Sequence, residues 1–267
     1  MRSPQLTPAK PTKRRLYWPW RDILDVLAFG AWSAMLFRYW FSGKILLLLH
    51  PNYTWLSHSA AFALVGLVAL TLFKIFRQMA GPQSGQTKDM LGHVTLMPPN
   101  ISSALLLGVA IFGLIYTPRA FASQTALQRG ISETLSLTRS QPQRFVRAAA
   151  PEERTIIDWI RLVNVYPEPD AYAGEPVDVV GFVIHPENWP DEYVMVARFV
   201  ITCCAADVYP VGLPIKLSAQ ERSDYPVDSW LRVTGEMTSE TLDGRRQLAI
   251  APTNIQQIAE PKNPYEY

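Results

Sequence analysis

Two adjacent cysteines, Cys203 and Cys204, have the most distinctive chemistry in this 267-residue chain, and they are its only cysteines. A thiolate is a nucleophile and a ligand for zinc, copper(I) or another soft metal. Nearby candidate companions are Arg198 and Asp207, and His185 stands further upstream. A single unspaced pair excludes both a disulfide framework and a spaced CxxC zinc motif. The pair is therefore a candidate thiol, metal or structural site, with the identity of any metal open.

The backbone around the two cysteines decides what they can do. Successive side chains of a regular strand point to opposite faces, so the two sulfurs could not then hold one metal. A bulge or turn would bring them to one side, where they could bind a soft metal or join in a vicinal disulfide. A third interpretation makes them small buried residues of a core. His185 precedes a proline at a strand end, which favours a turn residue over a ligand.

The elements that position this pair show a period of two from Gly174 onward. The alternation predicts five strands, at 176–185, 193–202, 208–217, 229–237 and 246–251. Gly181 and Gly235 lie inside two of these strands, where glycine marks a bulge or a sharp bend. Asp243-Gly244 predicts a hairpin turn. The C-terminal domain is therefore expected to be all-β, a small OB-like five-stranded barrel, with a β-sandwich as the alternative.

The first half of the chain differs sharply from the second. Residues 1–151 contain 16 Lys/Arg and 4 Asp/Glu, whereas residues 152–267 contain 9 and 19, so the two parts carry net charges of +12 and −10. Three apolar runs in the first part predict transmembrane helices, at 23–40, 55–73 and 101–117. Crossing a bilayer takes about 20 apolar residues, with about 17 near the minimum. The sequence predicts a membrane α-helical N-terminal region.

Basic residues predict the orientation of these helices. The tail at 1–21 contains six Lys/Arg, the first loop two and the second loop three, and the side richer in Lys and Arg is normally cytoplasmic. This predicts a basic cytoplasmic tail at 1–21, a three-helix transmembrane region at 22–117, a linker at 118–151 and an extracytoplasmic β domain at 152–267. A short amphipathic helix at 152–163 opens that domain.

Two segments carry a family resemblance, VARFVITCCAADVYPVG at 196–212 and IAEPKNPYEY at 258–267. Together with Gly43-Lys44 and His50-Pro51 after the first apolar run, they resemble the YcgQ-type (DUF1980) family of bacterial membrane proteins. The resemblance covers nearly the whole chain and is most specific over 174–267. It implies several helices in the bacterial inner membrane and a C-terminal β domain.

The same resemblance implies a partner, a multi-spanning permease of the DUF318 or YcgR type. A link to metal homeostasis has been suggested for some members of the family. Many members have a His-rich loop between the second and third spans. Residues 77–100 of this chain contain a single histidine, His93, and this departure weakens the case for metal handling by that loop.

Several classes of function are disfavoured by the sequence. It contains no Gly-rich phosphate loop, GxSxG elbow or HExxH motif, so we do not expect an enzyme. The charge of −10 on the second part opposes nucleic-acid binding. We expect an integral membrane accessory protein whose partners are the lipid bilayer and the permease. The alternative is a metal-handling or thiol-dependent membrane protein that uses Cys203 and Cys204.

Overall fold

The computed structural model describes residues 20–80, 99–130, 150–218 and 221–267. Nearly all of the predicted basic tail, the loop that contains His93, and the second half of the predicted linker lie outside the described residues. The chain forms two compact units, each considered by itself. One comprises residues 1–37 and 58–116, and the other comprises residues 38–57 and 117–267.

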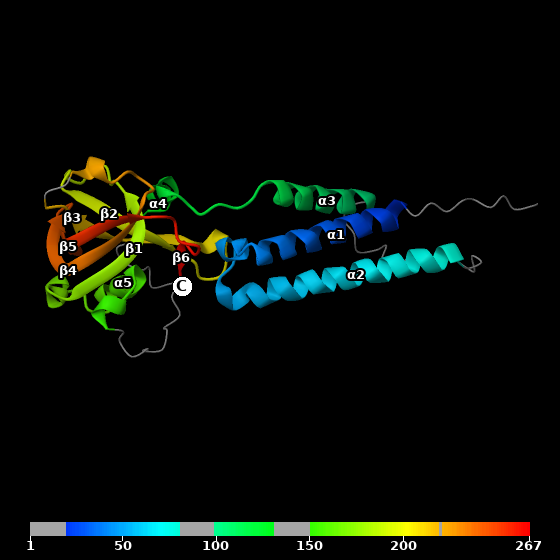
Figure 1. Cartoon of the computed structure of the whole chain (residues 1–267), viewed down its shortest axis with the longest axis horizontal. Helices are drawn as coiled ribbons and strands as arrows, with labels where there is room; N and C mark the ends of the chain where they lie inside the picture. Colours follow the sequence, from blue (N-terminus) through cyan, green and yellow to red (C-terminus); the bar gives the residue numbers. More distant parts are fainter. Residues whose placement is uncertain (1–19, 81–98, 131–149, 219–220) are drawn as a thin grey trace, which may run out of the picture. The chain divides into compact units, whose positions relative to one another are not determined.

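Helices occupy all three apolar runs of the first part (Figure 1): α1 (Trp20–Phe41), α2 (Thr54–Ala80) and α3 (Pro99–Ile115). Among the described residues, one helical stretch, Pro51–Ala80, is long and apolar enough to cross a membrane by length and composition. The third run forms a shorter apolar helix, Asn100–Ile115. The prediction of N-terminal helices is confirmed, one of them long and apolar.

Polar contacts join the helices of the first unit. Lys74 Nζ lies 3.0 Å from Asp22 Oδ1, the Ser103 hydroxyl donates a hydrogen bond to Asp25, and Trp32 Nε1 donates to the Leu106 carbonyl over 2.9 Å. The large apolar side chains of α2 and α3 are mostly exposed instead. The most exposed on these two helices are Trp55, Leu70, Phe73, Phe76, Met79, Phe112 and Ile115.

Strands of the second unit close into a five-stranded barrel. The strands are β1 (Pro176–Ile184), β2 (Tyr193–Val200), β3 (Tyr209–Lys216), β4 (Trp230–Leu242) and β5 (Arg245–Ile258), with a short β6 (Tyr265–Glu266). Their order is β1-β4-β5-β3-β2, and the pairing of β1 with β2 closes the sheet. The β3–β5 pairing is parallel, and β6 runs parallel to β2 as an addition. The small five-stranded barrel is confirmed, and the sandwich alternative is wrong.

Glycines lie where the strands of the barrel approach closely or shift register, as their positions in the sequence predict. The register of β4 against β5 shifts between Thr234 and Gly235. A Cβ atom at Gly235 would collide with the carbonyl of Ala251, and one at Gly181 would lie 2.5 Å from the Ala197 carbonyl oxygen. The predicted Asp243-Gly244 hairpin joins β4 to β5, with positive φ at both residues.

Strand β2 is buried along its whole length, because each of its faces packs into a different apolar cluster. Val194, Val196 and Val200 belong to one cluster, which also includes Ile156, Ile157, Trp159 and Ile160 of α5 (Ile156–Val165). Tyr193, Met195, Ala197 and Phe199 belong to the other. The alternation is that of a strand with side chains on both faces.

The predicted amphipathic helix at 152–163 is observed as α5, which starts slightly later. Thr155 and Asp158 form a reciprocal capping box at its first turn, and such a box satisfies two main-chain amides that a helix leaves free. The first half of the predicted linker contains a short helix, α4 (Ser123–Arg129). Its Ala126 is buried in the second cluster, with Phe121 packed beside it, so this part of the linker is integral to the barrel unit.

Candidate functional site

Cys203 and Cys204 lie where the chain leaves β2 and before it enters β3. They follow the end of that strand at Val200 and precede a single 3₁₀ turn, Ala205–Asp207. Cys203 is exposed and Cys204 is half-buried. Neither belongs to an apolar cluster, so the interpretation of the cysteines as core residues is wrong.

The irregular backbone at this point turns both sulfur atoms toward one another. The Sγ atoms of Cys203 and Cys204 are 3.6 Å apart. Asp207 lies on the same turn, with Oδ2 3.9 Å from the Cys203 sulfur, and this carboxylate also accepts a hydrogen bond from the Thr202 hydroxyl. The hydrogen bond to Cys204 raises the pKa of the Cys203 thiol. The structure therefore brings together three of the five residues that the sequence singles out, namely Cys203, Cys204 and Asp207.

A segment far away in sequence packs against the pair. Residues 48–50, in the connection between α1 and α2, run beside the cysteines as a short antiparallel bridge between Leu49 and Cys204. The His50 amide donates to the Cys203 carbonyl over 3.1 Å, and the Ala205 amide donates to the Leu48 carbonyl over 2.9 Å. Two main-chain hydrogen bonds thus flank the thiol pair.

The imidazole of His50 is held at the same place. It stacks edge-on against Tyr267, with ring centroids 4.9 Å apart, and its Nδ1 accepts a hydrogen bond from the Asn52 amide over 3.1 Å. Partial burial lowers the pKa of His50. A histidine whose Nδ1 accepts a main-chain hydrogen bond and whose ring packs on Tyr267 serves here to shape the connection.

Metal binding at the thiol pair can be tested against the donor set. A structural zinc ion takes four ligands and a catalytic one takes three from the protein. No group of three or more His, Cys, Asp or Glu side chains could hold a metal ion in the described part of the chain. Two thiolates suit a soft metal of low coordination number better than they suit zinc.

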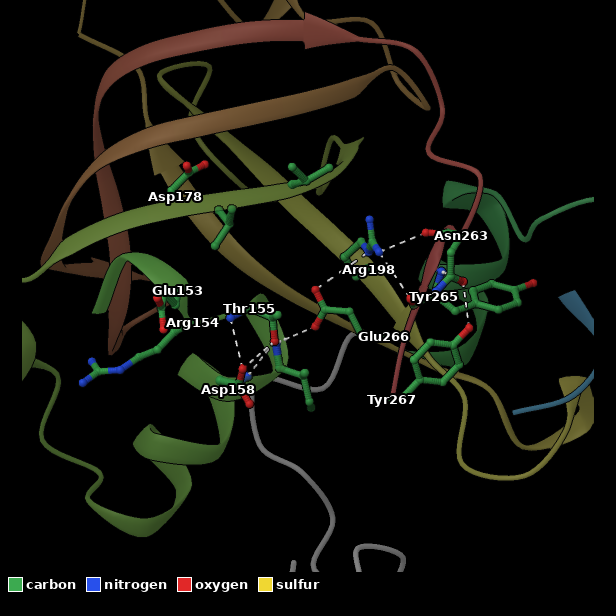
Figure 2. Close-up of a pocket in the computed structure, with 13 residues that line it drawn as sticks. Glu153, Arg154, Thr155, Asp158, Asp178, Arg198, Asn263, Tyr265, Glu266 and Tyr267 are labelled. Carbon is green, nitrogen blue, oxygen red and sulfur yellow. Dashed lines mark hydrogen bonds and ion pairs between the residues drawn. The ribbon is translucent and has the colours of Figure 1, made fainter. Parts of the chain in front are cut away.

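Arg198, the fourth candidate, makes its contacts elsewhere. It lies on the valine face of β2, 9% exposed, and its guanidinium donates to the main-chain carbonyls of Asn263 and Tyr265, each over 3.2 Å. Its Nε lies 3.8 Å from Glu266 Oε1. Figure 2 shows this pair, with the guanidinium directed to the C-terminal segment. Arg198 thus anchors β6 against β2.

Glu266 connects three elements and could not be recognised from the sequence. Its carboxylate accepts a hydrogen bond from the Ile157 amide over 2.8 Å, in the first turn of α5, and a negative charge is favoured at a helix N-terminus. Its own carbonyl accepts from the Ile201 amide. Burial raises the pKa of Glu266, and the Ile157 amide and Arg198 oppose that rise.

A cavity of about 460 Å³ opens beside this pair. Several of its charged lining groups are already engaged: Arg154 pairs with Glu175, and Asp178 accepts two hydrogen bonds from Arg232. We therefore interpret the cavity as the junction of α5, β1 and the C-terminal segment.

His185 has a structural role, with Nε2 2.8 Å from the Tyr225 carbonyl oxygen, as its place before a proline predicts.

Comparison with known proteins supports the family resemblance. Residues 156–267, which span α5 and the whole barrel, match the family model described as the DUF1980 C-terminal domain. Neither a curated protein nor a solved structure matches the chain. The matched range includes both Cys203–Cys204 and the Arg198–Glu266 pair. Residues 156–267 therefore form a DUF1980 C-terminal domain, which folds as a closed five-stranded barrel.

Proposed function

We propose that this chain is an integral membrane accessory protein that works beside a multi-spanning permease through an extracytoplasmic β-barrel. The observation that carries the proposal is the apolar stretch Pro51–Ala80, whose large side chains remain exposed. Large continuous apolar surface is rare on soluble proteins and is typical of a surface that faces lipid or another protein. A charged, folded barrel in the same chain supplies a module for contact outside the bilayer.

The proposed topology is multi-pass in the inner membrane, with the N-terminus in the cytoplasm. α1 carries Asp22, Asp25 and Arg38, but Asp22 and Asp25 have partners on the neighbouring helices. Polar groups within membrane helices normally pair inside the bundle. Three proposed crossings, combined with the excess of Lys and Arg in the tail and the second loop, support a position of the barrel outside the cytoplasm.

Paired reporter fusions test this topology. A reporter that is active only outside the cytoplasm should be active when fused after Tyr267 and inactive when fused after Ala80, which follows the second helix. A reporter that fluoresces only in the cytoplasm should give the reverse. Cytoplasmic activity at Tyr267 with an intact fusion would refute the extracytoplasmic barrel.

The partner is tested separately. The chain, purified from native membranes in mild detergent, should retain a permease of many spans, identified by mass spectrometry. A variant that lacks residues 150–267 is the matched control and should lose that protein while it stays in the membrane. If no multi-spanning protein co-purifies with the full chain, the accessory role is refuted.

The second candidate function is a thiol-dependent or metal-handling role for Cys203 and Cys204. The 3.6 Å separation of two accessible sulfurs favours it, because two thiols on one side of the backbone can react or bind jointly. Replacement of either cysteine by serine should abolish cellular function while the protein still melts like the wild type. Bound metal, measured on the purified chain and on the double serine variant, separates metal handling from thiol chemistry.

A further inference from the structure

The thiol pair and the connection between α1 and α2 share one set of main-chain hydrogen bonds. The Cys203 carbonyl accepts from the His50 amide, and the amide next to Cys204, that of Ala205, donates to Leu48. Residues 38–57 and the barrel belong to the same compact unit. Any change in the path of the Cys203–Cys204 backbone therefore acts on both hydrogen bonds.

The two sulfurs are close enough for a covalent bond after a small movement. They are 3.6 Å apart, and a disulfide needs a separation of about 2.05 Å. A bond between neighbouring cysteines closes a ring that contains the peptide group joining them. Cys204 has extended backbone angles, with φ −154° and ψ 170°, and closing so small a ring changes the backbone angles on both sides of the enclosed peptide group. Ring closure must therefore distort the backbone that now carries the Leu49–Cys204 bridge.

We propose that Cys203 and Cys204 form a reversible dithiol–disulfide couple whose oxidation releases residues 48–50 from the barrel. The inference rests on the second of the two proposed functions, the thiol-dependent one. In this proposal the thiol function of the pair is disulfide formation, and its structural consequence is the release of residues 48–50. The oxidant is a disulfide, either of a small molecule or of another protein, as expected for an oxidising compartment.

Thiol–disulfide exchange provides a balanced route. The more exposed thiol, that of Cys203, loses its proton, and its thiolate attacks one sulfur of the external disulfide and expels the other as a thiolate. The Cys204 thiolate then attacks the Cys203 sulfur of the mixed disulfide and expels the second external thiolate. The two cysteines are oxidised by two electrons, and one external disulfide is reduced to two thiols that take up the two protons.

The pH dependence of the first step follows from the surroundings of Cys203. The hydrogen bond to Cys204, and to a smaller extent the nearby Asp207, raise the pKa of the Cys203 thiol. The titratable groups that act on the Cys203 thiol are Cys204 and Asp207 on its own turn, whereas His50 on the segment packed beside it contacts Cys203 through its main-chain amide. Oxidation should therefore accelerate steadily from pH 7 to pH 9, as the thiolate fraction of Cys203 increases.

The test uses the full chain in detergent, reduced and then exposed to oxidised glutathione. Intact mass should show a loss of two hydrogen atoms with no retained glutathione, and both cysteines should resist alkylation. Hydrogen exchange at the amides of His50 and Ala205 should accelerate at least tenfold. The amide of Leu217, which donates to Glu192 on the same barrel, is the internal control and should not change. Cys204→Ser should stop at a glutathione adduct on Cys203, with unchanged exchange at His50.

Either of two other results would overturn the proposal. Two glutathione adducts, or two alkylated cysteines, would show that no vicinal disulfide forms. A vicinal disulfide with unchanged exchange at His50 and Ala205 would show that oxidation does not release the segment. If the serine variants lose cellular function in either case, the thiol-dependent function survives and only the redox release fails. If they function normally, the thiol-dependent function fails with it.

Discussion

The carboxylate of Glu266 accepts a hydrogen bond from the main-chain amide of Ile157 over 2.8 Å, although the two residues are 109 positions apart. The same carboxylate lies beside the guanidinium of Arg198, at 3.8 Å. One side chain thereby joins the start of α5, the end of β2 and the C-terminal segment. The integrity of the barrel unit should depend on it.

Removing that carboxylate should destabilise the protein strongly. Glu266→Ala leaves Arg198 buried without its counter-charge and frees the Ile157 amide, and breaking a buried ion pair on one side typically costs about 3–5 kcal/mol. The double change Arg198→Met with Glu266→Gln should cost less, since it leaves no buried charge. Thermal melts in detergent measure both. Glu260→Ala, at an exposed position, is the control, and an equal loss in the control and in Glu266→Ala would contradict the assignment.

Glu240 should confer a pH-dependent part of the stability. It accepts hydrogen bonds from Lys216 Nζ over 2.8 Å and from the Tyr193 hydroxyl over 3.0 Å, and the bond from Lys216 lowers the pKa of Glu240. An acid whose pKa is lower in the folded state stabilises the fold above its unfolded pKa, and the stabilisation is lost as the pH falls through the folded value.

The measurement compares Glu240→Gln with the wild type across pH. The variant should be less stable by about 1 kcal/mol at pH 7, given the partial exposure of Lys216. The difference in stability should narrow only as the pH falls below the pKa of an unfolded glutamate, about 4.3. A difference that is constant from pH 7 to pH 3 would refute an electrostatic contribution from this carboxylate.

Gly181 and Gly235 should not tolerate alanine. Each lies where a neighbouring strand leaves no space for a Cβ atom, so substitution forces strands apart, and overpacking of this kind costs about 1–3 kcal/mol. Gly66→Ala in α2, where nothing lies within 4 Å of the added carbon, is the control and should leave the melting temperature unchanged or higher. Gly181→Ala or Gly235→Ala with a wild-type melting temperature would show that the barrel relaxes freely at these points.

A charge at the middle of α2 should impair membrane insertion. Leu67 lies at the midpoint of the helix and is 45% exposed, and arginine at the centre of a span costs about 2.5–3.5 kcal/mol. Leu67→Arg should reduce the fraction of the chain that resists alkaline extraction from membranes. Gln78→Arg, near the end of the same helix, should behave as the wild type. Full retention of Leu67→Arg would argue against α2 as a lipid-facing span.

The sequence alone determined where the helices and strands of this protein lie. For most elements the predicted ends agree with the observed ones to within a few residues. The period of two located the five barrel strands, and the paired glycines and Asp243-Gly244 marked the points of tight curvature, because these signals are local. β4 and β5 run longer than expected, since their outer halves pair with each other beyond the apolar pattern. The three apolar runs located the three helices for the same local reason.

Only the tertiary structure decided which residues meet. Arg198 and the cysteines are near neighbours in sequence, yet the strand directs Arg198 to Glu266, while the turn after β2 exposes Cys203 and brings its sulfur next to that of Cys204. The docking of residues 48–50 on the cysteines depends on main-chain hydrogen bonds, for which every residue type has a carbonyl acceptor and all but proline an amide donor. Such contacts leave no trace in residue type, so the partner of the thiol pair could be found only once the chain was folded.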